Sequence, residues 1–109
     1  MGAAAQYEPR RITCVELVPE VIDAARLHFG EFNHHVLENP TAWNIELVID
    51  DGRNFLLSSR DTYQIITGDA TQLSALVGWV LYTKEFYELC RAHLTADGIM
   101  AQWLSLIHI

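Results

Sequence analysis

The chain has 109 residues, half of them hydrophobic, which suits one small globular domain or part of a larger one. Its formal net charge of −7, from 14 acidic and 7 basic side chains, argues against binding nucleic acid, which needs a clustered basic surface. No apolar run approaches the roughly 18 residues of a membrane span, and the N-terminus has no signal-peptide pattern. We therefore expect a soluble, cytoplasmic segment that contacts neither nucleic acid nor membrane.

The two cysteines, Cys14 and Cys90, are far apart in sequence and have apolar neighbours. Their spacing fits neither a metal site nor a redox motif. The adjacent histidines His34 and His35 do not share a helix face, and no third ligand is evident. We expect reduced core cysteines and no metal site.

The first predicted elements are a helix end over residues 1–6 and a strand over residues 12–18. The strand is almost continuously apolar apart from Glu16, a pattern typical of parallel strands buried on both faces. Pro19 suits the first turn of a helix that continues to about residue 29. The apolar residues expected on its inward stripe are Val21, Ile22, Ala25 and Phe29.

The middle of the chain predicts two further strands with a short helix between them. Residues 31–41 show no clear period, whereas residues 44–49 predict a second strand that stops at the turn signal Asp51-Gly52. Residues 53–58 follow as a short helix, and residues 63–67 as a third strand.

The last part of the chain predicts a loop, a helix and a fourth strand. Residues 70–80 resemble a loop, and Thr83 is suited to cap the helix because its side-chain oxygen can accept a hydrogen bond from the first turn. The inward stripe of this helix is Phe86, Cys90 and Leu94. Asp97-Gly98 is expected to end it, before a strand over residues 99–104. This alternation predicts a parallel, right-handed α/β sheet.

Three acids follow or end predicted strands, where ligands bind in open α/β sheets. Glu16 lies near the end of the first strand, Asp51 after the second and Asp69 after the third. The fold would bring these residues, distant in sequence, to one rim. That placement is the main evidence for a functional site.

Each acid has a functional and a structural interpretation. Glu16 is suited to accept hydrogen bonds from ribose hydroxyls, or it is an acid at a solvated strand end. Asp51 could accept from an adenine amino group while Gly52 permits close backbone approach, although Asp-Gly is also a common turn; the neighbouring Asp50 is expected to be solvated. Asp69 is suited to attract and deprotonate an ammonium group, or it is a helix-cap or turn aspartate.

Four segments resemble those of spermidine synthase-like proteins, the polyamine aminopropyltransferases, and occur in the same order. They are residues 15–21 (VELVPEV), 51–56 (DGRNFL), 81–87 (LYTKEFY) and 98–103 (GIMAQW). The resemblance covers nearly all of residues 11–104, and the combination is much more specific than any one segment.

The resemblance implies a Rossmann-like parallel sheet of the S-adenosylmethionine-dependent methyltransferase type, incomplete in this chain. It implies that decarboxylated S-adenosylmethionine donates an aminopropyl group to a diamine such as putrescine. Glu16 would bind the ribose, Asp51 with Gly52 the adenine, and Asp69 would accept the proton of the amine. Tyr82 would line the polyamine channel, with aromatic packing as the alternative. The sulfonium is already a good leaving group, so no metal is required.

The chain also departs from the family pattern. Gln72 stands where the family has an acid three residues after the catalytic aspartate, and Gln64 replaces an aspartate after Tyr63. We expect residues 1–104 to be a partial domain, since the glycine-rich nucleoside loop should precede its first helix. Residues 105–109 depart from the family continuation and are expected to be a non-native tail.

Two alternative functions share these features. A class I methyltransferase that uses S-adenosylmethionine would have the same fold and the same role for Glu16. A non-catalytic spermidine synthase-like module, as the cytosolic domain of a membrane protein, would explain the neutral Gln72. The intact protein is further expected to form a homo-oligomer.

Overall fold

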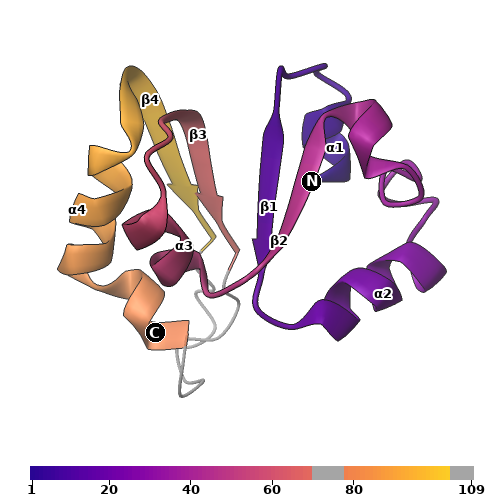
Figure 1. Ribbon diagram of the computed structural model, residues 1–109, viewed down its shortest axis with the longest axis horizontal. Helices are drawn as coiled ribbons and strands as arrows, with labels where there is room; N and C mark the ends of the chain where they lie inside the picture. The colour runs from indigo at the N-terminus through magenta and orange to yellow at the C-terminus, as the bar shows by residue number, and fades with distance from the viewer. Residues whose placement is uncertain (70–77, 104–109) are drawn as a thin grey trace. The chain divides into compact units, whose positions relative to one another are not determined.

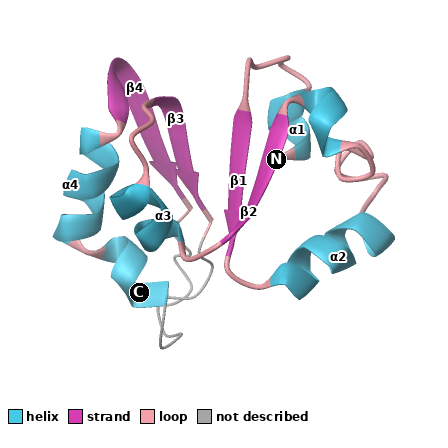
Figure 2. Cartoon of the chain, viewed as in Figure 1, coloured by secondary structure: helices cyan, strands magenta, loops and turns pink. Residues whose placement is uncertain are grey.

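The computed structural model describes residues 1–69 and 78–103, and the chain divides into two compact units, Met1–Phe55 and Leu56–Ile109 (Figure 1). Each unit combines helices with a pair of parallel strands (Figure 2). The predicted α/β class is therefore confirmed. That the four strands form one continuous sheet stays a prediction.

The first unit contains α1 (Gly2–Ala5), β1 (Ile12–Glu16), α2 (Pro19–His28), the 3-10 helix η1 (Pro40–Trp43) and β2 (Ile45–Ile49). Strands β1 and β2 pair in parallel, from Ile12 opposite Ile45 to Glu16 opposite Ile49. Pro19 occupies the first turn of α2, as predicted. Strand β1 ends two residues earlier than predicted, because the chain turns at Glu16, whose carboxylate accepts a hydrogen bond from the Val18 amide.

A small apolar core holds the first unit together. Its members are Ala5, Ile22, Val36, Leu37 and Ile45, with Ile12, Ala25, Trp43 and Leu47 packed against them. Val21 and Phe29 were also expected to face inward, but both are about half exposed, at 50% and 54%. The inward stripe of α2 is therefore narrower than its sequence suggested.

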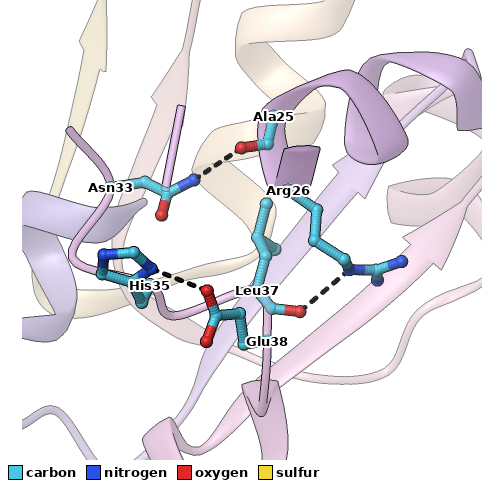
Figure 3. A network of polar contacts seen from close by, with 6 residues as sticks. All are labelled: Ala25, Arg26, Asn33, His35, Leu37 and Glu38. Carbon is cyan, nitrogen blue, oxygen red and sulfur yellow. Dashed lines mark hydrogen bonds and ion pairs between the residues drawn. The ribbon is translucent and has the colours of Figure 1, made fainter. Parts of the chain in front are cut away.

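The segment after α2 has no regular secondary structure, yet it supplies two of the most buried side chains, Val36 and Leu37. Polar contacts fix its path (Figure 3): Asn33 donates to the Ala25 carbonyl at 3.1 Å, and Arg26 donates to the Leu37 carbonyl at 3.0 Å. The Leu37 carbonyl gains its partner in this way, while the Ala25 carbonyl also accepts from the Phe29 amide at the end of α2. Side-chain hydrogen bonds, rather than the repeating backbone bonds of a helix or strand, thus fix the path of this segment.

The second unit contains β3 (Tyr63–Gly68), the 3-10 helix η2 (Gly78–Tyr82), α4 (Lys84–Ala92) and β4 (Leu94–Gln102), while α3 (Gly52–Ser58) crosses the boundary between the units. Strands β3 and β4 are parallel. Leu56, Phe86 and Cys90 are buried. Thr83 caps α4 as predicted, since its hydroxyl oxygen accepts a hydrogen bond from the Phe86 amide at 3.2 Å.

The predicted end of the last helix at Asp97-Gly98 is wrong. Helix α4 ends at Ala92, and β4 has already begun at Leu94, which is therefore not part of the helix stripe. The register moves from Leu94 opposite Tyr63 to Ile99 opposite Ile65, so the residues between them form an irregularity in the strand. Asp97-Gly98 lies in this irregularity. Its turn signal therefore marks a break within β4 and not, as predicted, the end of the helix.

Candidate functional site

The acids of the first unit lie at the carboxyl edge of the β1–β2 pair. Glu16 is the last residue of β1 and lies opposite Ile49, the last residue of β2. The Asp50 amide donates to the Glu16 carbonyl at 3.1 Å, which extends the strand pairing by one bond. The parallel register therefore brings Glu16, Asp50 and Asp51 to one edge.

Glu16 is half-buried and uses one carboxylate oxygen locally. Its Oε1 accepts from the Val18 amide at 3.0 Å. Its Oε2 accepts no hydrogen bond from the residues that the structure describes. Because an ionised carboxylate accepts through both oxygens, Glu16 keeps the capacity to bind a pair of hydroxyl groups.

Asp51 caps helix α3, a structural role that the turn interpretation missed. Its Oδ1 accepts hydrogen bonds from the amides of Arg53, at 2.9 Å, and Asn54, at 3.1 Å. Its Oδ2 accepts none from residues 1–69 and 78–103. Aspartate directly before a helical segment is a favoured cap, so the sequence did contain this signal. Asp51 can cap the helix and bind a donor at the same time.

Gly52, the first residue of α3, is a glycine for no reason visible within the described chain. A Cβ atom built on it meets no heavy atom within 4 Å. No glycine among the described residues has a positive φ, so the backbone does not require one here either. The position is open to an approaching molecule.

Asp50 was expected to be solvated, and the structure shows it to be so only in part. The residue is half-buried, and its Oδ1 accepts a hydrogen bond from the Asp51 amide at 2.7 Å. No sequence pattern pointed to this contact, because it depends on the conformation of a single junction between a strand and a helix.

Asp69 follows β3 directly and is exposed. Its side chain accepts no hydrogen bond from the described part of the chain. Gln72, the expected substitution for a family acid, lies outside the described residues. Asp69 belongs to a different unit from Glu16 and Asp51, so their meeting at one rim stays a prediction.

Tyr82 lies at the carboxyl end of the β3–β4 pair. Its hydroxyl donates to the Trp103 carbonyl at 3.3 Å, and the Trp103 amide donates to the Gly68 carbonyl at 2.9 Å. The Gln102 side chain donates to the Leu81 carbonyl at 3.1 Å from the same strand end. The second unit therefore holds Tyr82 at the edge from which Asp69 continues.

Two observations on residues 1–69 and 78–103 concern possible metal ligands and the cysteine thiols. No group of three or more His, Cys, Asp or Glu side chains there could hold a metal ion. Burial raises the pKa of the Cys14 and Cys90 thiols, which keeps both in the less reactive protonated form. No helix in the described residues is long and apolar enough to cross a membrane.

Two pairs of parallel strands with helices between them are compatible with an incomplete Rossmann-like α/β fold of the S-adenosylmethionine-dependent methyltransferase type. The sequence model of the spermine/spermidine synthase domain matches residues 4–105. The chain therefore belongs to the spermine/spermidine synthase family, which confirms the resemblance found in the sequence.

Several curated relatives carry the name polyamine aminopropyltransferase. Polyamine aminopropyltransferase 1 of Pseudomonas aeruginosa is 31% identical over 90 residues, which cover 83% of this chain and 30% of the relative. The protein of Sulfurisphaera tokodaii is 32% identical over 94 residues (85% and 30%), and that of Erwinia tasmaniensis is 35% identical over 89 residues (82% and 30%). The chain thus spans 30% of the length of each of these relatives.

Proposed function

We propose that the protein transfers an aminopropyl group from decarboxylated S-adenosylmethionine to a diamine such as putrescine. One observation carries this proposal. Glu16 and Asp51 lie at one strand edge, and each has one carboxylate oxygen fixed by backbone amides and a second that accepts nothing from the described residues. Family membership makes a nucleoside the ligand that suits them.

The first unit would bind the nucleoside part of the donor. The ribose hydroxyls donate to Oε2 of Glu16, and the adenine amino group donates to Oδ2 of Asp51. Gly52 lets the ring approach the backbone, since no neighbouring atom occupies the space of a Cβ there. Fixed acceptors of this kind lose little freedom when the ligand binds.

The second unit would supply the base. The amine nitrogen attacks the aminopropyl carbon beside the sulfonium and forms a C–N bond. The C–S bond breaks, its electron pair goes to sulfur, and neutral methylthioadenosine leaves. Before this attack, the ammonium nitrogen gives a proton to Asp69, an exposed carboxylate suited to that transfer, which frees the lone pair that forms the bond. Tyr82 would line the polyamine site, and no metal takes part.

The remaining expectations about the whole protein belong to this proposal. Its net charge of −7 suits a cationic acceptor. The proposed enzyme is cytoplasmic and homo-oligomeric, and residues 1–104 form part of its catalytic domain, with residues 105–109 as a non-native tail.

The test is a donor comparison with the full-length protein. Purified protein is given putrescine with either decarboxylated S-adenosylmethionine or S-adenosylmethionine, and spermidine and methylthioadenosine are measured. We expect product from the decarboxylated donor alone. Methyl transfer from S-adenosylmethionine would establish a methyltransferase instead, and nucleoside binding without turnover of either donor would establish a non-catalytic module.

A matched pair of variants tests the ribose contact. Glu16→Gln keeps an oxygen for the Val18 amide but removes the charge, and we expect methylthioadenosine affinity to fall about 10- to 100-fold, as for a lost bond to a charged group. Glu46→Gln removes a charge from an exposed position of β2 and should change affinity less than twofold. Equal effects of the two variants would contradict the role of Glu16.

A further inference from the structure

Asp50 is the half-buried acid to which the proposed function assigns no role. It makes two contacts, one through its backbone amide and one through its carboxylate. Its amide donates to the Glu16 carbonyl at 3.1 Å, and its Oδ1 accepts from the Asp51 amide at 2.7 Å. Asp50 therefore joins the end of β1 to the residue that follows it.

These contacts form a continuous chain of hydrogen bonds across the edge. It runs from the Glu16 carbonyl to Asp50, from the Asp50 carboxylate to the Asp51 amide, and from the Asp51 carboxylate to the amides of Arg53 and Asn54. The peptide group between Asp50 and Asp51 cannot rotate without breaking one of these bonds. Asp50 therefore holds the backbone from which the Asp51 side chain starts, and the two amides of α3 hold its carboxylate.

Such fixation matters because the junction is short. Asp51 is the single residue between the bend at Asp50 and the first residue of α3. A carboxylate in this setting could turn toward water, and repulsion from the adjacent Asp50 would favour that movement. The 2.7 Å bond of Asp50 to an amide is short and charge-assisted, so it opposes the movement.

We propose that Asp50 is a positioning residue that holds the Asp51 carboxylate in the direction needed to accept from an exocyclic amino group of a nucleoside. This inference rests on the proposed function, because Asp51 is the residue that would touch the ligand. Asp50 acts only through Asp51.

The test measures a ligand preference in the full-length protein by titration calorimetry. The two probes are methylthioadenosine and the same nucleoside without its 6-amino group. We expect the wild type to prefer methylthioadenosine by about tenfold, the value of one hydrogen bond to a charged group. Asp50→Ala should bring this preference close to one, with less than threefold change for the probe without the amino group. Asp50→Asn, which keeps an oxygen acceptor, should retain most of the preference.

Two further variants make the test decisive. Asp50→Glu keeps the charge but moves the acceptor by one methylene, so it should lose most of the preference even if Asp50→Ala does not fold. Glu46→Ala removes an exposed charge from β2 and should keep the preference in full.

The outcomes separate this inference from the function on which it rests. A wild type without preference overturns the assignment of Asp51 and the inference with it. A wild type with the preference, combined with Asp50→Glu that keeps it, overturns the role of Asp50 alone. Equal weakening of both probes in Asp50→Ala also overturns it, because a purely structural role would affect both ligands.

Discussion

The two units hold their candidate acids in different ways. In the first unit, Glu16 and Asp51 each accept hydrogen bonds from backbone amides of the turn or helix that follows. In the second unit, Asp69 is exposed and accepts no hydrogen bond from the described residues, although Tyr82 and Gln102 join η2 to the end of the neighbouring strand β4. The acids of the first unit bind backbone amides of the fold, whereas Asp69 accepts no hydrogen bond from residues 1–69 and 78–103.

This difference matches the separate tasks proposed for the acids. An acceptor that orients a ligand works best when its direction is fixed in advance. A base must change its protonation state during turnover, and strong bonds to the charged form would oppose that change. Mutations should therefore have different effects in the two units. A change at Glu16 or Asp51 should alter both the stability of the protein and its affinity for the nucleoside, whereas a change at Asp69 should alter only the rate of aminopropyl transfer.

The largest expected effect is that of Asp69→Asn in the full-length protein. Loss of the base should lower kcat for aminopropyl transfer by about 10²- to 10⁴-fold. The free energy of unfolding should change by less than about 0.5 kcal/mol, because the side chain is exposed. Product formation and urea denaturation measure the two quantities. Unchanged transfer would eliminate Asp69 as the base, and a large loss of stability would contradict the contrast between the units.

The next largest effect tests the core of the first unit. Leu37 is 2% exposed, so Leu37→Ala should lower the free energy of unfolding by about 2–5 kcal/mol. Leu27 on α2 is 75% exposed, and Leu27→Ala makes the same chemical change with an expected cost below about 0.5 kcal/mol. Urea denaturation compares them. Similar costs would show that the irregular segment after α2 is not part of the core.

The elements with strong local patterns could be predicted from the sequence. The β-branched runs of β1 and β2, Pro19 in the first turn of α2 and Thr83 as the cap of α4 each depend on residues close in the chain. Asp97-Gly98 misled the prediction because its local turn character is used inside a strand, where pairing with β3 decides the structure. Local signals fail where a distant strand sets the register.

The sequence could predict where the acids of the candidate site lie, but not the hydrogen bonds that hold them. The carboxyl ends of neighbouring parallel strands lie at the same edge of a sheet. Glu16 and Asp51 could therefore be placed at one edge because each stands at the carboxyl end of a predicted strand. The bond from Asp50 to the Asp51 amide depends on one set of backbone angles that no periodicity encodes. The burial of Val36 and Leu37 was missed for a similar reason, since side chains rather than a repeating backbone fix their segment.

A smaller expected effect distinguishes two roles of Asp51, the capping of α3 and the proposed binding of the nucleoside. Asp51→Ala removes the cap of α3 and should cost about 1 kcal/mol of stability, while Asp51→Ser keeps a capping oxygen and should cost little. Both variants remove the carboxylate, so both should weaken methylthioadenosine binding. Thr83→Ala is the counterpart in the second unit, with a similar loss of stability and unchanged nucleoside affinity. If Asp51→Ser bound the nucleoside like the wild type, Asp51 would be a cap alone.

The smallest effect concerns the two thiols, one in each unit. Burial raises the pKa of Cys14 in β1 and of Cys90 in α4, so the folded chain favours the protonated thiol more than the unfolded chain does. This contribution to stability is complete well below about pH 8.5, the ordinary pKa of a thiol in an unfolded chain, and is lost as the pH rises through and above that value. We therefore expect the melting temperature to fall more steeply between pH 8 and 10.5 in the wild type than in Cys14→Ala or Cys90→Ala, since the alanine variants share every other titrating group.

Because Cys90 is fully buried and Cys14 is partly accessible, a disulfide reagent at neutral pH should modify Cys14 first. Faster modification of Cys90 would contradict this order and show that α4 opens more readily than β1.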